Sequence, residues 1–239
     1  SELFKNPEWI RKQRILEIIL SSIIGIDIHP FATFLTSLNI SFQLLDFYSL
    51  VKRYNETFTL DIKTITHDSL AEPGDAPILE SETNSRIIEV VKRSQEYATI
   101  NKVKFDFVVG NPPWGGVLRG KIGPLGDERI REKHKKAFVS ATGKYDIYVL
   151  FIERGFRWLK DGGIFGMITQ NTYLESDFGR GIIKYITENA KIKYLIDLGE
   201  IGDLIFPGFT NYPCITVMEK GNGGGAEIKV VKVSRRKRT

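Results

Sequence analysis

Four consecutive residues of this chain, Asn111-Pro112-Pro113-Trp114, have the groups that are needed to activate an amino group. The amino group of an aromatic base is a poor nucleophile because its lone pair is delocalised into the ring. An Asn side-chain carbonyl and a neighbouring backbone carbonyl can each accept one N–H of such a group, which draws the lone pair back onto nitrogen. Pro113 favours an extended conformation at Pro112, and neither proline has an N–H that competes for the carbonyl. The ring of Trp114 offers a face on which the base can stack.

The same four residues are compatible with an ordinary turn, because Asn-Pro and Pro-Pro pairs are frequent in loops. Their position favours an active site over an ordinary turn. They follow the apolar run 105–109, and the active sites of open α/β sheets lie at the carboxyl ends of strands. The tetrapeptide resembles the catalytic motif of the amino-methyltransferases, which methylate an exocyclic or amide nitrogen from S-adenosylmethionine. By this resemblance all four residues are catalytic, and Asn111 also borders the cofactor.

Apolar segments of strand length alternate with segments of helical periodicity along the chain. Strands are predicted at 23–28, 61–66, 105–109, 164–169, 192–198, 212–219 and 226–233, and helices at 8–20, 29–47, 85–98, 145–159 and 174–189. Residues 73–82 are predicted to form a polar loop, and the run Lys160-Asp161-Gly162-Gly163 is a typical signal for the end of a helix. The alternation favours an α/β fold with a doubly wound, mostly parallel sheet.

The resemblance gives this fold a more specific form, the Rossmann-like sheet of the S-adenosylmethionine-dependent methyltransferases. A methyltransferase catalytic domain is expected over residues 1–220. Residues 221–239 are expected to contain a turn, a terminal strand and a basic tail, as the possible start of a C-terminal region.

Two acidic residues that follow the first two predicted strands are candidates for binding a nucleoside. Asp27 lies where nucleotide-binding α/β folds place a carboxylate that accepts the ribose hydroxyls, with capping of the next helix as the alternative. The string at 25–32 resembles the corresponding methyltransferase motif, so Asp27 and Ile28 are expected to bind S-adenosylmethionine. Asp68 and Ser69 follow the second strand. By the same resemblance the Asp68 carboxylate accepts the adenine amino group of the cofactor, with an Asx-turn as the alternative.

Positive charge is concentrated in two segments. The net charge is +5, but four positive charges lie in the last six residues, so the total says little about partners. The segment 116–144 has a local excess of five positive charges and directly follows the tetrapeptide, where a phosphate backbone has to pass. We expect six of its side chains to contact DNA phosphates: Arg119, Lys121, Arg129, Arg131, Lys135 and Lys136. The alternative is a solvated helix face with i,i+4 ion pairs.

The resemblance extends beyond one motif. The blocks 143–148, 151–153, 159–163, 168–173 and 206–215 look like the successive blocks of the adenine-N6 DNA methyltransferases of restriction–modification systems. The match covers roughly residues 23–220, in the gamma-type order, in which the target-recognition domain is C-terminal. It implies a target-base pocket formed by Trp114, Lys144, Tyr145 and Phe206. Phe206 is expected to be a second aromatic face, opposite or edge-on to Trp114, and the alternative is a core residue before a turn.

One motif of this family is missing from the sequence. A Gly-rich loop that holds the methionine end of the cofactor is expected ahead of Asp27, but the first hundred residues contain only Gly25 and Gly74. The chain is therefore expected to be a fragment that lacks the first strand, this loop and the target-recognition domain. Its expected partners are double-stranded DNA and the missing N-terminal part, a specificity domain or a nuclease subunit.

The composition excludes several other classes. A single cysteine, Cys214, cannot form a disulfide framework or a zinc cluster, so no metal site is expected and the residue is predicted to be a small core side chain. The most apolar stretch, 15–28, is interrupted by charged and polar residues, so no membrane span is expected. No signal peptide is visible, and a reducing cytoplasm is the expected location.

These observations predict a site-specific DNA methyltransferase that transfers a methyl group from S-adenosylmethionine to the N6 atom of a flipped-out adenine, with the isolated fragment expected to be inactive. Two alternatives remain open. One is a non-catalytic, DNA-binding remnant of such an enzyme. The other is a methyltransferase that acts on protein glutamine or on guanine in ribosomal RNA.

Overall fold

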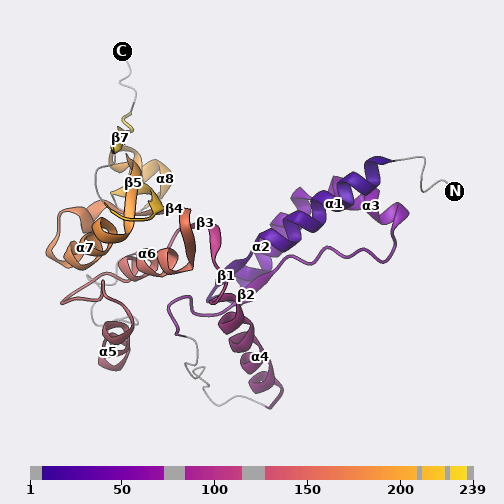
Figure 1. The fold of residues 1–239 in the computed structure, drawn as a ribbon, viewed down its shortest axis with the longest axis horizontal. Coiled ribbons are helices and arrows are strands. Elements are labelled where there is room, and N and C mark those ends of the chain that lie inside the picture. Colours follow the sequence, from indigo (N-terminus) through magenta and orange to yellow (C-terminus); the bar gives the residue numbers. More distant parts are fainter. Residues whose placement is uncertain (1–6, 73–83, 115–126, 209–211, 224–226, 236–239) are drawn as a thin grey trace. The chain divides into compact units, whose positions relative to one another are not determined.

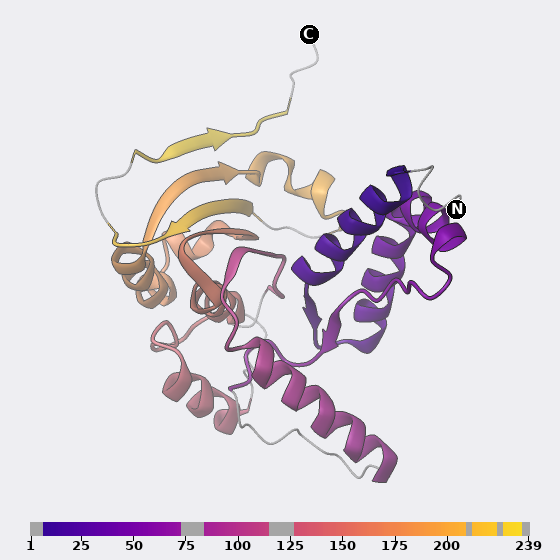
Figure 2. The same cartoon turned by 45° about the vertical axis from the view of Figure 1, so that its right-hand side comes forward.

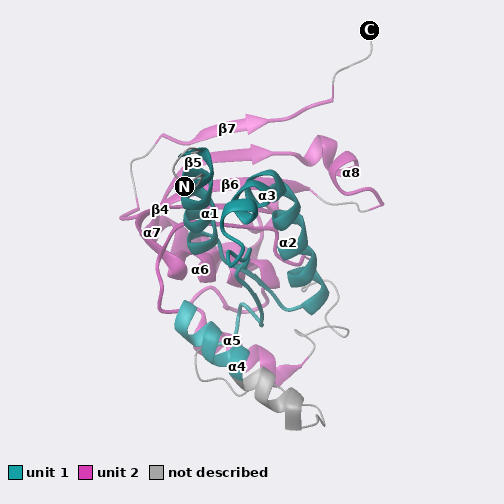
Figure 3. Cartoon of the chain, turned by 90° about the vertical axis from the view of Figure 1, so that its right-hand side faces the viewer, with its two compact units in different colours: residues 1–100 teal, residues 101–239 magenta. Residues whose placement is uncertain are grey.

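The computed structural model describes residues 7–72, 84–114, 127–208, 212–223 and 227–235. These residues form two compact units, Ser1–Ile100 and Asn101–Thr239, which Figure 3 distinguishes by colour. Each unit is described by itself. The predicted polar loop at 73–82 lies outside the described residues.

The described residues of the first unit form two short parallel strands and four helices (Figure 1). In chain order these are α1 (Pro7–Ser22), β1 (Gly25–Asp27), α2 (Pro30–Gln43), α3 (Leu45–Tyr54), β2 (Thr64–Thr66) and α4 (Asn84–Ile100). Strands β1 and β2 pair in parallel, with Asp27 beside Thr66. Helix α2 meets β2 through hydroxyl groups: Thr33 Oγ1 lies 2.9 Å from Thr66 Oγ1, and Ser37 Oγ lies 3.0 Å from Thr64 Oγ1.

The single helix predicted at 29–47 is wrong, because the structure has two helices there. Helix α2 ends at Gln43 and α3 begins at Leu45, with Leu44 between them at φ −100° and ψ 0°. Helix α2 packs on β1 and β2, whereas α3 packs on α1, where the rings of Trp9 and Tyr54 stack with centroids 5.7 Å apart. One straight helix cannot make both contacts, and apolar periodicity alone does not reveal the bend.

The second unit is built on a five-stranded sheet, whose strands Figure 2 shows. Its strands are β3 (Phe105–Gly110), β4 (Leu159–Gln170), β5 (Ala190–Asp197), β6 (Pro213–Lys220) and β7 (Lys229–Lys232). Its helices are α5 (Glu128–Ala137), α6 (Ile147–Trp158), α7 (Arg180–Asn189) and α8 (Gly202–Ile205), with short 3-10 turns at Asn171–Leu174, Asp177–Gly179 and Gly199–Ile201.

The sheet is mixed, which corrects the prediction of a mostly parallel sheet. The strand order is β3-β4-β6-β5-β7. The pairs β3–β4 and β5–β7 are parallel, but β6 runs antiparallel to both of its neighbours, β4 and β5. The α/β class was predicted correctly. The direction of β6 depends on pairing between distant segments, and a run of apolar residues does not encode it.

The glycine run after α6 also differs from its prediction as a helix end. Helix α6 already ends at Trp158, and Gly162 and Gly163 lie inside β4. They occupy an irregular part of the ladder in which Phe105 is beside Leu159 but Phe107 is beside Ile164. Gly162 has a φ of 77°, a conformation that side-chain-bearing residues rarely adopt, so the glycine here permits a bulge.

The core of this unit lies between the sheet and two helices. Helix α6 packs on β3 and β4, α7 packs on β5, and the two helices contact each other. The fully buried rings of Phe156 and Phe165 lie 5.0 Å apart between centroids. On β3, by contrast, Phe107 and Val109 are 70% and 80% exposed.

Close packing of α6 on β4 requires a glycine at position 155. A Cβ added there would lie 2.6 Å from Cε2 of Phe165 and 3.3 Å from Cγ1 of Val108. In an exposed helix Gly→Ala stabilises by about 1 kcal/mol. Overpacking of a filled core costs about 1–3 kcal/mol, so we expect the steric cost to win.

We therefore predict that Gly155→Ala lowers the Tm of the protein by about 2–4 °C, as measured by calorimetry. The matched control is Gly221→Ala, where an added Cβ meets no atom within 4 Å. If Gly155→Ala melts at or above the Tm of the unaltered protein, the Phe165 ring can move to accept the added methyl group, and the close packing of α6 on β4 does not require a glycine.

Candidate active site

The predicted catalytic residues directly follow the edge strand β3. Strand β3 ends at Gly110, so Asn111 is the first residue beyond its carboxyl end. Asn111 and Pro113 are exposed, whereas Pro112 is buried. The exposed Asn111 amide is accessible to a ligand, and the buried Pro112 ring anchors the loop to the protein.

The aromatic ring of this loop contacts Phe206, and the role of the two rings as a base pocket stays a prediction. The centroids of Trp114 and Phe206 lie 4.8 Å apart, and their planes are inclined by 74°, an edge-to-face arrangement. Phe206 follows α8, and its N–H donates to the carbonyl of Gly202 at 2.8 Å. Trp114 Nε1 is buried and has no hydrogen-bond partner among the described residues.

The two remaining pocket candidates differ in their surroundings. Lys144 is exposed, whereas Tyr145 is buried. The Tyr145 hydroxyl lies 3.2 Å from Nδ1 of His134 on α5. Burial raises the pKa of Tyr145 to about 12, so its hydroxyl stays protonated at neutral pH.

The carboxyl end of β4 lies at the same edge of the sheet as Asn111, because β3 and β4 are parallel. The Asn171 N–H donates to the Tyr212 carbonyl at 2.9 Å. The Tyr148 hydroxyl lies 3.0 Å from Thr172 Oγ1. Tyr148 lies within the block 143–148, and the sequence pattern does not reveal this contact. It ties α6 to the loop after β4.

The two cofactor candidates, Asp27 and Asp68, lie in the first unit, at the carboxyl ends of β1 and β2. Asp27 Oδ1 accepts the His29 N–H at 2.7 Å, and the backbone carbonyl of Asp27 accepts the His67 N–H at 2.9 Å. Helix α2 is capped by His29, whose Nδ1 accepts the Phe31 N–H, so Asp27 is not the cap. Ile28 beside it is exposed.

Asp68 forms the Asx-turn that was its alternative reading, since Oδ1 accepts the Leu70 N–H at 2.9 Å. Its side chain is still exposed, and its second oxygen, Oδ2, takes no part in this turn. Tyr97 on α4 supports the loop: its buried hydroxyl lies 3.0 Å from the Ser69 carbonyl, and its ring stacks on His67 at 4.1 Å. The sequence analysis missed Tyr97, because it is one of several polar and apolar residues in a helical segment.

The basic residues that are predicted to contact DNA lie partly on α5. Arg129 pairs with Asp127 at 2.9 Å, Lys135 pairs with Glu132 at 2.8 Å, and both pairs are largely solvated. The hydrogen bond and charge of Arg129 lower the pKa of Asp127. Such exposed pairs contribute little and can exchange partners. Lys136 is exposed and Arg131 is half-buried, whereas Arg119 and Lys121 lie outside the described residues.

Two features of the described residues concern metal binding and membrane insertion. Within the described ranges, no cluster of three or more His, Cys, Asp or Glu side chains could hold a metal ion. No helix among the same residues is long and apolar enough to cross a membrane. Cys214 is buried in β6, as predicted, and burial raises the pKa of its thiol.

The chain is similar to several restriction–modification proteins. It is 32% identical over 133 residues to the type II methyltransferase M.BstVI of Geobacillus stearothermophilus, which covers 56% of this chain and 22% of that protein. It is 28% identical over 202 residues to the type II restriction enzyme and methyltransferase RM.Eco57I of Escherichia coli, which covers 77% of this chain and 20% of that protein. The chain therefore spans about a fifth of the length of these relatives.

Solved structures share the fold at low sequence identity. The type ISP restriction–modification enzyme LlaGI, solved as a nuclease-deletion mutant with a DNA substrate mimic, has a TM-score of 0.63 and 15% identity over 97% of this chain and 20% of that chain. DrdV in its DNA complex has a TM-score of 0.61 and 13% identity over 93% of this chain and 22% of that chain. The model of one family, the Eco57I restriction-modification methylases, matches residues 21–203. With more than half of its length matched, the chain belongs to the Eco57I restriction-modification methylase family.

Proposed function

We propose that this chain is the catalytic part of a DNA methyltransferase that methylates the N6 atom of adenine. The observation that carries the proposal is the place of Asn111-Pro112-Pro113-Trp114, directly beyond the carboxyl end of β3 and in contact with Phe206. Membership of a restriction-modification methylase family supports methyl transfer as the reaction. The relatives named as DNA complexes support DNA as the substrate.

The Asn-Pro-Pro loop has the two acceptors that an exocyclic amine requires. The Asn111 side-chain carbonyl accepts one N–H and the Pro112 backbone carbonyl accepts the other, so the nitrogen lone pair becomes available. The buried Pro112 ring keeps its carbonyl in place, which supplies preorganisation before the substrate arrives. Orientation supplies much of the rate, since effective molarities reach about 10⁵–10⁸ M in well-aligned reactions.

The aromatic pair accounts for the recognition of an unstacked base. Removing a base from the duplex costs a few kcal/mol, and stacking on an aromatic ring returns about 1–3 kcal/mol. Trp114 offers its face to the base. Phe206, which is inclined by 74° to the ring of Trp114, borders the same space. Exposed Lys144 lies on the loop that leads into α6.

The residues of the first unit fit S-adenosylmethionine, which supplies an activated methyl group on a sulfonium when it is bound. Asp27 and Asp68 are exposed carboxylates at the ends of two adjacent parallel strands. Each uses Oδ1 for a backbone N–H and has Oδ2 as a further acceptor. Asp27 would accept the ribose hydroxyls and Asp68 the adenine amino group, with Ile28 and Ser69 beside them.

We predict that Asn111→Ala lowers the turnover of the full-length protein on duplex DNA by about 10²–10³-fold, because one of two preorganised acceptors is lost. Binding of S-adenosylmethionine should stay nearly unchanged. Methyl transfer is measured with a radiolabelled cofactor on genomic DNA. The matched control is Asp106→Asn, an exposed residue of the same strand that pairs with Lys160 at 2.9 Å.

Unaltered turnover of Asn111→Ala would remove this residue from catalysis. Methylation of a glutamine peptide, with none of duplex DNA, would replace the DNA substrate by a protein. Duplex binding without any cofactor binding would identify a non-catalytic remnant.

We predict that Asp27→Ala raises the Kd for S-adenosylmethionine by about 10–100-fold, since a hydrogen bond to a charged group contributes about 1.5–3 kcal/mol. Calorimetric titration of the full-length protein measures this constant. Asp27→Asn keeps an acceptor for the His29 N–H, so its Kd should lie between that of the unaltered protein and that of Asp27→Ala. The control is Asp61→Ala, an exposed carboxylate that precedes β2. An unchanged Kd in Asp27→Ala would exclude this side chain from the cofactor site.

A further inference from the structure

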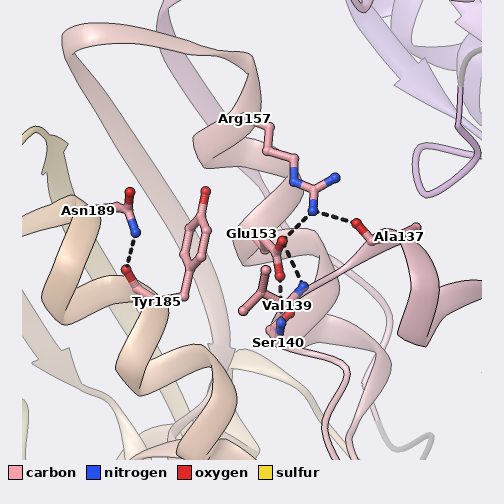
Figure 4. A network of polar contacts seen from close by, with 7 residues as sticks. All are labelled: Ala137, Val139, Ser140, Glu153, Arg157, Tyr185 and Asn189. Carbon is pink, nitrogen blue, oxygen red and sulfur yellow. Dashed lines mark hydrogen bonds and ion pairs between the residues drawn. The ribbon is translucent and has the colours of Figure 1, made fainter.

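A fully buried carboxylate on α6 holds the segment that follows α5. The Glu153 side chain is 0% exposed. Its Oε1 accepts the Val139 N–H at 3.1 Å, and its Oε2 accepts the Ser140 N–H at 2.8 Å (Figure 4). A buried carboxylate is costly unless it is paired and hydrogen-bonded, and here both oxygens have backbone partners. Glu153 thereby fixes the first turn after α5.

Arg157, one helical turn beyond Glu153, completes the contact. Its Nη2 donates both to Glu153 Oε1 and to the backbone carbonyl of Ala137, the last residue of α5 (Figure 4). The last carbonyls of a helix have no partner within it, so Arg157 caps α5 from a neighbouring helix. The Arg157 side chain is 31% exposed, whereas its carboxylate partner is inaccessible.

Further groups close around this ion pair. The ring of Phe138, the residue that follows α5, lies 4.8 Å from the guanidinium of Arg157 and 4.9 Å from that of Arg154. Burial, and then the negative charge of Glu153, raise the pKa of Tyr185 on α7. The carbonyl of Tyr185 accepts the Asn189 side-chain N–H at 2.8 Å, a hydrogen bond within the last turn of α7 (Figure 4). The end of α5 is thus tied to α6 by a charged network in the interior.

The segment held in this way contains two sets of residues for which the sequence predicts contacts with DNA. Helix α5 and its cap, from Asp127 to Lys136, have five basic side chains against three acidic ones. The pocket candidates Lys144 and Tyr145 follow within a few residues of the turn, and the Tyr145 hydroxyl lies against His134 of α5. A displacement of α5 would therefore move the phosphate contacts and the pocket wall together.

We propose that Glu153 and Arg157 are positioning residues, which hold the basic helix α5 and the pocket segment in one arrangement on α6, so that DNA phosphates bound by α5 are in register with the base pocket. This inference rests on the proposed function. Neither residue touches the substrate; both act through the turn at residues 137–140. Apolar residues of similar volume often stabilise a core as well as a buried ion pair does, so stability alone does not require these charges.

The test measures DNA and cofactor binding separately on the full-length protein. Affinity for a fluorescein-labelled duplex is followed by anisotropy over a series of NaCl concentrations, and S-adenosylmethionine affinity is followed by calorimetry. For Glu153→Gln we expect about a tenfold weaker duplex affinity. We also expect a slope of log K against log[salt] that is shallower by about two, since each lost phosphate contact removes about 0.9. The cofactor Kd should change less than twofold, whereas a general loss of folding would weaken both ligands.

Arg157→Gln provides a second variant if Glu153→Gln does not fold, because the Arg157 side chain is partly exposed and the Glu153 carboxylate keeps its two backbone N–H donors. It should shift duplex affinity and salt slope in the same direction, and Arg157→Lys, which keeps a charged donor, should recover most of the affinity. The matched control is Glu219→Gln, which removes a carboxylate that pairs with Lys193 at 2.8 Å on the strands β5 and β6. It should behave as the unaltered protein.

The outcomes separate this inference from the proposed function. Unchanged duplex affinity and salt slope in the folded variants would overturn the positioning role and leave methyl transfer untouched. A parallel loss of cofactor and duplex affinity would also overturn it, by showing a purely structural role. An unaltered protein that binds neither duplex nor S-adenosylmethionine would overturn the proposed function and this inference with it.

Discussion

Parallel strand pairing brings the polar residues of each unit to one edge of its sheet. In the first unit, β1 and β2 are aligned so that Asp27 lies beside Thr66, and the loop with Asp68 begins just beyond. In the second unit, β3 and β4 are aligned in the same sense, which places Asn111 next to the loop after β4. In open α/β sheets ligands bind beyond the carboxyl ends of the strands, which is where these residues lie.

The central strand of the mixed sheet joins the other strands of the second unit. Strand β6 lies between β4 and β5 and pairs with both along nearly its whole length. One face of these strands is buried under α6 and α7, including the ring of Phe165 and the side chains of Cys214 and Met218. The Tyr173 hydroxyl, 3.0 Å from Thr216 Oγ1, continues this packing into the loop after β4. The Asn-Pro-Pro loop thus follows β3, whose neighbour β4 also pairs with β6.

Hydroxyl and charged groups take interior positions where apolar residues would be expected. Helix α2 turns Thr33 and Ser37 toward β2, and its Phe31 and Phe34 are exposed. In the second unit, the buried Glu153 is compensated by two backbone N–H groups and Arg157. In both cases the polar groups face specific partners, so they fix one orientation of a helix, which apolar contacts do less well.

The sequence by itself determined the features that depend on neighbouring residues. The strand before Asn111, the short strand that ends at Asp27 and the burial of Cys214 follow from local apolar runs and punctuation, because these patterns act within a few residues. The tetrapeptide and its resemblance also identified the family that the comparison found. The site residues remain proposals that rest on this motif.

Only the tertiary structure decided the features that join distant segments. These are the antiparallel direction of β6, the break at Leu44, the ring contact between Trp114 and Phe206, and the capping of α5 by Arg157. Each depends on which elements pack together, and packing is decided by the shape and charge of partners far apart in the chain. A linear pattern records that a residue is apolar or charged, but it does not record which partner that residue meets.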